Sequence, residues 1–241
     1  MKTMKFCDLH THVLPAVDDG APNMEYALQM LDNAVASDVQ ALVVTPHCSS
    51  VYGNYLNEAL LSRFLQLQKA AKDIPIQLFL GAEVLADARL PQQLRQGCIP
   101  TINGSRYVLT EFPGDTKPGD FPGLLQSILE IGYIPLIAHP ERYQAVCHAP
   151  QIVMQWLDMG CHLQLTGGSV MGEYGKTVQR TAASLLRNDL VACIASDAHS
   201  LHGRSNFLLD VYDHLSIHYC RQYARCLMYE NPMGICANDD I

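Results

Sequence analysis

Two histidines near the start of the chain have the spacing of a metal-binding pair. The segment Asp8-Leu9-His10-Thr11-His12 places two imidazoles two residues apart at the end of an apolar run. Alternate residues of a strand face the same side, so both rings can bind one ion. Two surface or core histidines would give the same short pattern, so the assignment depends on further ligands.

Residues of ligand type recur along the chain directly after short apolar runs. Each run has the length and composition of a buried strand, and a histidine or a carboxylate follows it. The residues that share this position are His47, Glu83, Glu111, His139, Asp197 and His199. Chance rarely places six such residues in this way, so the pattern predicts a metal site.

The number of candidate ligands predicts more than one ion. An ion with four or five ligands takes three or four protein groups and leaves a position for water. The set would serve two or three ions that share carboxylates, with Glu83 and Glu111 as bridges. Such clusters clamp the attacking and leaving oxygens in phosphoryl transfer and lower the pKa of water, so no separate nucleophile is needed.

The acidic loop Val17-Asp18-Asp19-Gly20 follows the histidine pair and is expected to supply one further ligand. Its spacing does not choose between Asp18 and Asp19. A solvated turn that leads into a helix is the alternative interpretation of the same residues.

Two arginines lie close to the ligands in sequence. Arg142 ends the run His139-Pro140-Glu141-Arg142, and Arg204 lies five residues after His199. A guanidinium fork binds phosphate oxygens bidentately, so we predict that both arginines bind a phosphate. Solvated or ion-paired arginines are the alternative. Glu141 is expected to face away as a structural group, and Gly167-Gly168 either admits the substrate to the backbone or forms a turn.

The elements that must position these residues alternate along the chain. The expected strands cover residues 5–9, 41–45, 76–80, 106–110, 134–138, 162–166 and 191–195. The expected helices cover a segment capped by Asn23 and residues 56–72, 121–131, 151–159, 176–187, 206–215 and 219–229. Apolar strands between helices predict a parallel sheet buried on both faces. Because nearly every strand ends in a polar residue, we expect a distorted seven-stranded (βα) TIM-like barrel rather than an open sheet.

Bulk composition limits the class of protein. The length of 241 residues suits one domain over residues 1–241, and the net charge of −8 disfavours a nucleic-acid surface. Nine cysteines without a C-x-x-C pair indicate reduced thiols. Residues 1–12 do not resemble a signal peptide, and no apolar run approaches the ~18 residues of a membrane span, so we expect a cytoplasmic protein.

The motifs resemble those of a known family. D-L-H-T-H, V-D-D-G, T-P-H, G-A-E, H-P-E-R and S-D-A-H, which extend from Asp8 to about Arg204, look like the PHP-domain metallophosphoesterases. Most closely they are similar to the CpsB/YwqE-type bacterial protein tyrosine phosphatases of capsule and exopolysaccharide operons. The resemblance implies a barrel of the PHP type and a trinuclear site, loaded with manganese or alternatively with iron or zinc.

The resemblance also implies roles for individual residues. One ion would bind His10, His12, Glu83 and Asp197, and a second would bind Glu83, Glu111 and His139. The third would bind His47, His199 and an aspartate of the acidic loop, Asp19 in preference to Asp18. Arg142 and Arg204 would bind the phosphate. Many relatives have a second histidine where this chain has Cys48, which we expect at the mouth of the site.

The resemblance implies hydrolysis of phosphotyrosine, with the tail of a bacterial tyrosine autokinase as the substrate. A small-molecule phosphatase of the same family, similar to histidinol-phosphate phosphatase, is the alternative. An amidohydrolase with a carboxylated lysine is disfavoured because none of the six lysines follows a suitable strand. A cysteine-dependent phosphatase is excluded because no cysteine has an arginine six residues later. A metal-binding scaffold would leave both arginines unexplained.

Overall fold

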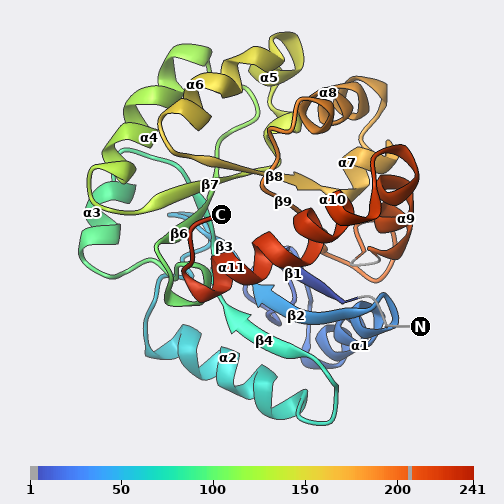
Figure 1. Cartoon of the computed structure of the whole chain (residues 1–241). Coiled ribbons are helices and arrows are strands. Elements are labelled where there is room, and N and C mark those ends of the chain that lie inside the picture. Colours follow the sequence, from blue (N-terminus) through green and yellow to red (C-terminus); the bar gives the residue numbers. More distant parts are fainter. Residues whose placement is uncertain (1–4, 206–207) are drawn as a thin grey trace.

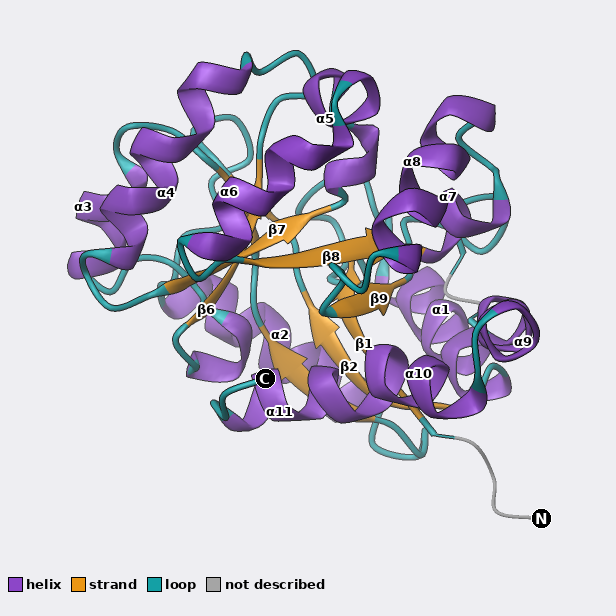
Figure 2. Cartoon of the chain, turned by 45° about the horizontal axis from the view of Figure 1, so that its top comes forward, coloured by secondary structure: helices purple, strands orange, loops and turns teal. Residues whose placement is uncertain are grey.

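The computed structural model describes residues 5–205 and 208–241, and its strands lie inside a layer of helices (Figures 1 and 2). The strands are β1 (Phe6–Thr11), β2 (Val39–Val44), β3 (His47–Cys48), β4 (Gln77–Leu80), β5 (Glu83–Leu85), β6 (Tyr107–Glu111), β7 (Ile134–Ala138), β8 (His162–Thr166) and β9 (Cys193–Ala195). The helices are α1 (Met24–Ala36), α2 (Glu58–Ala70), α3 (Leu90–Arg95), α4 (Phe121–Leu129), α5 (Gln144–His148), α6 (Val153–Asp158), α7 (Gly167–Met171), α8 (Lys176–Arg187), α9 (Leu209–His218), α10 (Arg221–Arg225) and α11 (Asn231–Ala237).

The named strands pair in parallel and form two sheets. The orders are β1-β2-β4 and β3-β5-β6-β7-β8-β9. The chain passes directly from the first sheet to the second at two places, between β2 and β3 and between β4 and β5. The backbone remains hydrogen-bonded there, because Gly81 N donates to Val44 O (2.9 Å) and Glu83 N donates to Pro46 O (3.1 Å).

The expected alternation of parallel strands and helices is confirmed, but a closed seven-stranded barrel is not. The described residues form strands in two separate sheets, because the chain passes from one sheet to the other just after the expected strands 41–45 and 76–80, near Pro46 and Gly81. At the outer edges, β1 and β9 meet through one parallel bridge between Thr11 and Ala198. Asp197 N donates to His10 O (2.9 Å) and His12 N to Ala198 O (2.8 Å), so the carboxyl ends of these strands lie side by side.

Most expected elements are found within a few residues of their expected bounds. The segments 134–138, 162–166 and 176–187 coincide with β7, β8 and α8. The helix expected at 206–215 corresponds to α9, and its first two residues, Asn206 and Phe207, lie outside the described residues. The helix expected at 219–229 is present from Arg221, but it is longer than expected, because α10 continues through a π-helical turn, Cys226–Glu230, into α11.

Helix α11 packs against an apolar cluster formed by the strands. Cys7, Leu9 and Leu109 of the strands belong to the same buried cluster as Ile235 and Cys236 of the helix. The chain around α11 also bonds to the beginnings of strands: Tyr107 Oη donates to Asp239 O (2.7 Å) and Asn231 Nδ2 donates to Ala192 O (2.8 Å). Helix α11 therefore covers the amino ends of the strands and leaves their carboxyl ends for the polar residues.

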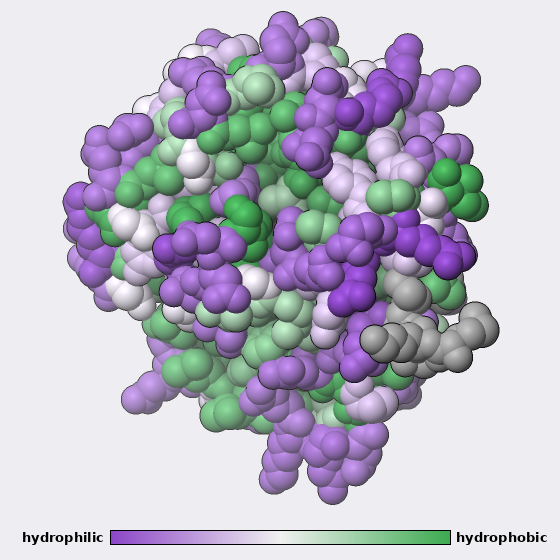
Figure 3. Space-filling model, viewed as in Figure 1, coloured by the Kyte–Doolittle hydropathy of each residue, from purple (hydrophilic) through white to green (hydrophobic). Residues whose placement is uncertain are grey.

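The face that carries α11 has a mixed surface. Hydrophilic side chains dominate Figure 3, and hydrophobic residues gather in patches, one of them over α2 in the lower part of the view. Leu61 and Leu65 of α2 are exposed apolar residues. Within residues 5–205 and 208–241, no helix combines the length and the apolar character that crossing a bilayer requires.

Helix α1 illustrates how the outer layer is fixed. It buries Ala27, Met30, Leu31 and Ala34, which recur at helical spacing. Its N-cap is Asn23, as predicted, and Asn23 Oδ1 accepts a hydrogen bond from Tyr26 N (2.9 Å). This bond satisfies a backbone donor that the helix itself cannot pair.

Replacing Asn23 with alanine should therefore lower the free energy of unfolding by about 1 kcal/mol. Asn23→Ser is the matched control, because serine also caps helices and should retain most of the stability. Urea denaturation of the three proteins measures the difference. Equal stability of the alanine and asparagine proteins would show that this cap does not stabilise α1.

Candidate metal centre

Four buried ligand atoms converge on one point at the carboxyl end of the strands. They are Nε2 of His10 and His12, Oε2 of Glu83 and Oδ1 of Asp197. Five separations among them lie between 3.2 and 3.6 Å. Ligand atoms ~2.1 Å from a tetrahedral ion lie about 3.4 Å apart, so this spacing fits a metal site. The group is the one that the resemblance implies for the first ion.

Glu83 joins this group to a second one. Its Oε2 lies 3.0 Å from His47 Nδ1, and its Oε1 lies 2.8 Å from His139 Nε2. Glu111 completes the second group, with oxygens 3.9 Å from His47 and 3.7 Å from His139. The compact set of ligand atoms here is His47, Glu83 and Glu111, so His47 joins the expected ligands Glu83, Glu111 and His139. His139 remains beside it.

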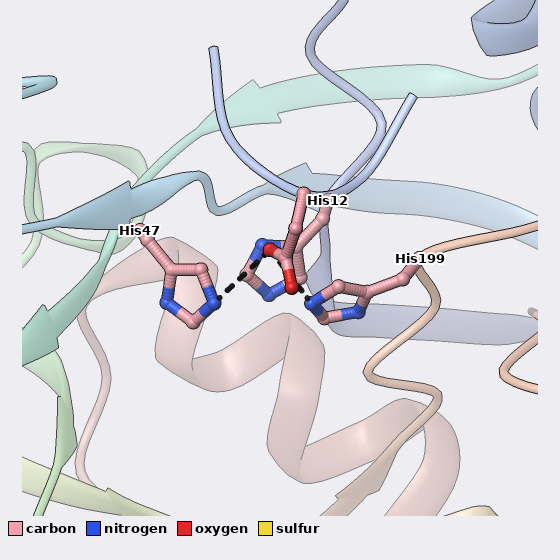
Figure 4. A group of neighbouring side chains, drawn as sticks. His12, His47 and His199 are labelled. Atoms are coloured by element: carbon pink, nitrogen blue, oxygen red, sulfur yellow. Dashed lines mark ion pairs between the residues drawn. The ribbon is translucent and has the colours of Figure 1, made fainter. Parts of the chain in front are cut away.

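A third group lies at the rim and contains His12, Asp19, His47 and His199. Figure 4 shows the imidazoles of His12, His47 and His199 gathered around one centre, with dashed lines marking the ion pairs. Asp19 Oδ1 lies 3.5 Å from both His47 Nε2 and His199 Nε2. Thus Asp19 rather than Asp18 faces the rim group, and His12 joins the histidines expected there.

Hydrogen bonds on the far side of the rings determine which nitrogen faces the centre. Gln164 Nε2 donates to Leu165 O (2.6 Å), which turns Gln164 Oε1 toward His10 Nδ1 (3.0 Å). An amide oxygen only accepts, so His10 carries its proton on Nδ1 and Nε2 is free for a metal. His199 Nδ1 donates to Asp197 O (3.0 Å) in the same way.

The acidic loop is folded back on His12. Asp18 Oδ2 accepts from His12 Nδ1 (2.8 Å) and from His47 N (3.0 Å), so Asp18 orients a ligand. Ala21 N donates to His12 O (2.9 Å), which draws the loop against the strand end. A Cβ at Gly20 would lie 2.0 Å from His12 O, so only glycine fits there. The loop is therefore part of the site and not a solvated turn.

Two site residues have left-handed backbone conformations. His139 has φ 35° and directly follows β7. Asp197 has φ 55° and lies two residues after the end of β9. Residues with side chains adopt this region at an energetic cost and are enriched in it at functional sites. In both cases the backbone turns sharply where the side chain enters the metal centre.

The charges of the centre favour cations. Burial opposes ionisation of Glu83, but the charge of His10 and hydrogen bonds from His10, His12 and His139 hold its pKa well below the usual range. Burial lowers the pKa of His12, but hydrogen bonds to Asp18 and Glu83 outweigh it and raise the pKa to about 10. The carboxylates thus attract protons onto histidines, at nitrogens where metal ions would also bind.

Several buried polar atoms of the centre have no hydrogen-bond partner among the described residues. They include Asp197 Oδ1, His199 Nε2 and His139 Nδ1. Such atoms are rare because their desolvation is costly. Imidazole nitrogens and carboxylate oxygens are the ligands of Zn, Mn and Fe. The residues present therefore fit divalent ions.

Both predicted phosphate-binding arginines contact the same oxygen. Arg142 Nη1 and Arg204 Nη2 each lie 2.7 Å from Asp197 Oδ2, while Oδ1 of that residue faces His10 and His12. Arg142 Nε and Nη2 and Arg204 Nε are buried without a hydrogen-bond partner in the described part of the chain. Each guanidinium therefore keeps unused donors beside the metal centre.

Three supporting residues were not found from the sequence. Gln164 lies in a strand that was expected to contribute no ligand. The sequence feature that could have indicated it is an amide side chain between the leucines of a buried strand. Asp8 Oδ1 accepts from Ser196 N (2.9 Å) and so joins β1 to the end of β9; burial raises its pKa to about 6. The Arg142 guanidinium lies over the ring of Tyr174, with Cζ 3.9 Å from the ring centroid, and no sequence pattern predicts this contact.

Residues next to the candidate ligands have structural roles. Glu141 is a structural group as predicted, because its buried Oε1 accepts from Thr166 N (3.0 Å). Gly167 and Gly168 form no turn but begin α7. The expectation that Cys48 lies at the mouth is wrong, because its side chain packs in an apolar cluster with Val84 and Leu90.

Comparisons with known proteins agree with this geometry. A family model described as "Capsular polysaccharide synthesis, CpsB/CapC" matches residues 6–237. Tyrosine-protein phosphatase CpsB of Streptococcus pneumoniae is 32% identical over 235 residues, which cover 95% of this chain and 97% of that protein. Tyrosine-protein phosphatase YwqE of Bacillus subtilis is 33% identical over 202 residues, which cover 82% and 79%. A solved structure from work on YwqE and CpsB, described there as unique metal-dependent tyrosine phosphatases, has a TM-score of 0.91 at 30% identity and covers 98% of this chain and 96% of its own.

Metal affinity should rise with pH. In the metal-free protein the pKa of His12 is about 10, so this ring carries an extra proton at neutral pH, and, although burial opposes it, the charges of Glu83 and Asp197 raise the pKa of His10 above its usual value. An ion must displace such protons, and each displaced proton strengthens binding by up to ~ten-fold per pH unit. Titration with Zn²⁺ between pH 6 and 8, in buffers of different ionisation heat, measures both affinity and protons released. His12→Gln should show a smaller slope, and a pH-independent affinity of the unaltered protein would contradict the assignment.

Proposed function

Because this chain belongs to the CpsB/CapC family and is a metal-dependent tyrosine phosphatase, we propose that the centre formed by its strand ends hydrolyses phosphotyrosine in proteins. The observation that carries the proposal is the meeting of two functions on Asp197. One oxygen of this residue faces the candidate metal ligands and the other holds both arginines. A phosphate bound between them would contact cationic groups on both sides.

We assign the ligands of three ions, with manganese as the metal and iron or zinc as alternatives. His10, His12, Glu83 and Asp197 would hold the first ion, and Glu83, Glu111 and His139, with His47 nearby, would hold the second. Asp19, His47 and His199, with His12, would hold the third. When bound, such ions activate water and neutralise charge on the phosphate. Asp18 and Gln164 would hold His12 and His10 in the orientation that this binding requires.

The two arginines would bind and orient the phosphate of the substrate. Their unused N–H groups are buried at the edge of the centre, where charge-assisted hydrogen bonds are strong. Asp197 Oδ2 and the ring of Tyr174 fix the guanidinium of Arg142 before the substrate arrives. Such preorganised donors stabilise the charge that is redistributed in phosphoryl transfer.

The described residues offer no support for two rival chemistries. Lys5, Lys69, Lys72, Lys117 and Lys176 are all exposed, so none is placed to bridge metals as a carboxylated lysine. Burial raises the pKa of the Cys48 thiol to about 12, and the same effect raises that of Cys161 to about 12. These thiols would stay protonated at neutral pH and are poor nucleophiles.

The wider setting also belongs to the proposal. The name of the family connects it with capsular polysaccharide synthesis, and we propose a tyrosine autokinase tail as the substrate. Nine free cysteines fit a reducing compartment, which supports the cytoplasm as the location. We further propose that residues 1–241 form one domain whose two sheets act as a single distorted barrel of the PHP type, joined at the Thr11–Ala198 bridge.

Replacing Arg142 or Arg204 with alanine should lower kcat/KM on a phosphotyrosine peptide by about 10²–10³-fold, because one preorganised donor to the reacting phosphate is lost. Metal content should hold, since the other arginine still contacts Asp197. Lysine should rescue only in part because it lacks the fork.

Arg225→Ala is the matched control for these two variants. Arg225 Nε lies 2.9 Å from Glu230 in an exposed ion pair, and such pairs contribute only ~0–1 kcal/mol to stability. Near-normal kcat/KM in both Arg142→Ala and Arg204→Ala would overturn the phosphate assignment. Elemental analysis of each protein shows whether a loss of rate reflects a loss of metal instead.

Thiol alkylation of the native protein should leave most of the activity, whereas a strong chelator should abolish it. The accessible thiols, such as that of the exposed Cys220, lie outside the described site. Activity should return when Mn²⁺ is added back after the chelator is removed. Complete inactivation by iodoacetamide with the metal content intact would instead indicate a cysteine nucleophile.

A further inference from the structure

A short loop after β3 stands at the rim of the metal centre and is held in a defined conformation. This rim loop (residues 49–54) closes with an antiparallel bridge, in which Gly53 N donates to Ser49 O (2.8 Å). Asn54 Nδ2 donates to His47 O (2.9 Å) and to Val17 O (3.1 Å), which ties the loop to the acidic loop. The rim loop is therefore braced against two segments of the centre.

The tip of the rim loop presents apolar side chains to solvent. The ring of Tyr52 stacks on the His47 imidazole, with centroids 5.1 Å apart and an interplanar angle of 18°. The Tyr52 residue is still 43% exposed, and Val51 beside it is 83% exposed. One face of the ring thus lies on a candidate metal ligand while much of the side chain remains free for contact with another molecule.

The remainder of the centre determines where a substrate can extend. His10, His12, Glu83 and Asp197 are almost fully buried, so a phosphate cannot pass below them. The arginines and Tyr174 occupy the Asp197 side. His47 is partly exposed on another side, and there the group esterified to the phosphate would meet Tyr52. An aromatic ring placed there would stack or pack edge-on against Tyr52, a favourable geometry for aromatic pairs.

We propose that Tyr52, with Val51 beside it, forms a subsite for the aromatic ring of an aryl phosphate such as a phosphotyrosine side chain. The inference rests on the proposed phosphatase function and assigns to this loop the preference for aryl over alkyl esters. Tyr52 then acts as a substrate-contacting residue and not only as a cover for His47. The flat, rigid ring adds contact area at a small cost in conformational entropy.

The test compares Tyr52→Ala, Tyr52→Leu and Tyr52→Phe with the unaltered protein, and Ile217→Ala is the control for an exposed apolar residue far along the chain. Phenyl phosphate and glycerol phosphate are the substrates, and the ratio of their kcat/KM values is compared between proteins. The difference in reactivity between the two leaving groups is the same for every protein, so it cancels in this comparison. Calorimetry measures the Kd of phenylphosphonate and methylphosphonate on the metal-loaded proteins. Elemental analysis and a thermal melt accompany each variant.

Tyr52→Ala should lower the ratio of kcat/KM for phenyl phosphate to that for glycerol phosphate by about two- to ten-fold, the effect of one aromatic contact. It should raise the Kd of phenylphosphonate by a similar factor and leave the Kd of methylphosphonate unchanged. Phenylalanine should preserve both, and leucine should fall between. An unchanged ratio and unchanged Kd values would overturn the proposal. An equal loss on both substrates together with lost metal would also overturn it, since Tyr52 would then only support His47. If the unaltered protein, loaded with metal, does not hydrolyse a phosphotyrosine peptide, the proposed function fails, and the phosphonate Kd values still decide the subsite.

Discussion

Glu83 places a negative charge where almost no water reaches, and a charge buried in this way needs cationic partners. Its two oxygens lie near His10, His12, His47 and His139, which come from β1, β3 and the end of β7. Those histidines can reach it only if parallel strands from distant parts of the chain end at the same level. The register His47↔Glu83 between β3 and β5 provides this alignment. The packing of the strands and the electrostatics of the centre are therefore two aspects of one requirement.

Sequence reasoning worked best where a short apolar run ends in a polar residue. Strand β7 is wholly apolar and β8 alternates leucines with polar residues, and the bounds of both strands and the following His139 were predictable. It failed where the outcome depends on contacts between segments. The passage of the chain into a second sheet near Pro46, just after the expected strand 41–45, was not predicted. Spacing alone did not choose between Asp18 and Asp19, and only the resemblance gave the preference for Asp19 that the rim geometry supports. The approach of His47 to the second group likewise depends on loop geometry that no local pattern encodes.

Asp197 connects two tasks that a list of motifs would separate. Its Oδ1 faces the candidate ligands of the first group and its Oδ2 accepts from both arginines, so the proposed metal binding and phosphate binding would share one carboxylate. Burial opposes its ionisation, but the positive charges of His10 and His139, with Arg142 also contributing, keep the pKa of Asp197 below its usual range. The left-handed backbone at this residue fits the same role, because it turns the chain where both oxygens must be presented. A change in either set of partners would therefore be felt by the other.

The position of α11 has a consequence for how the protein is made. This helix supplies Ile235 and Cys236 to the cluster that contains Cys7 and Leu9, residues more than two hundred positions earlier in the chain. During synthesis β1 leaves the ribosome long before its partners in α11 exist, so its inner side chains lack their final cover until α11 has been made. Contacts so distant in sequence form slowly, because a long loop must close before they bring any gain. The nascent chain thus exposes this apolar surface until α11 emerges, and chaperones bind such exposed hydrophobic segments.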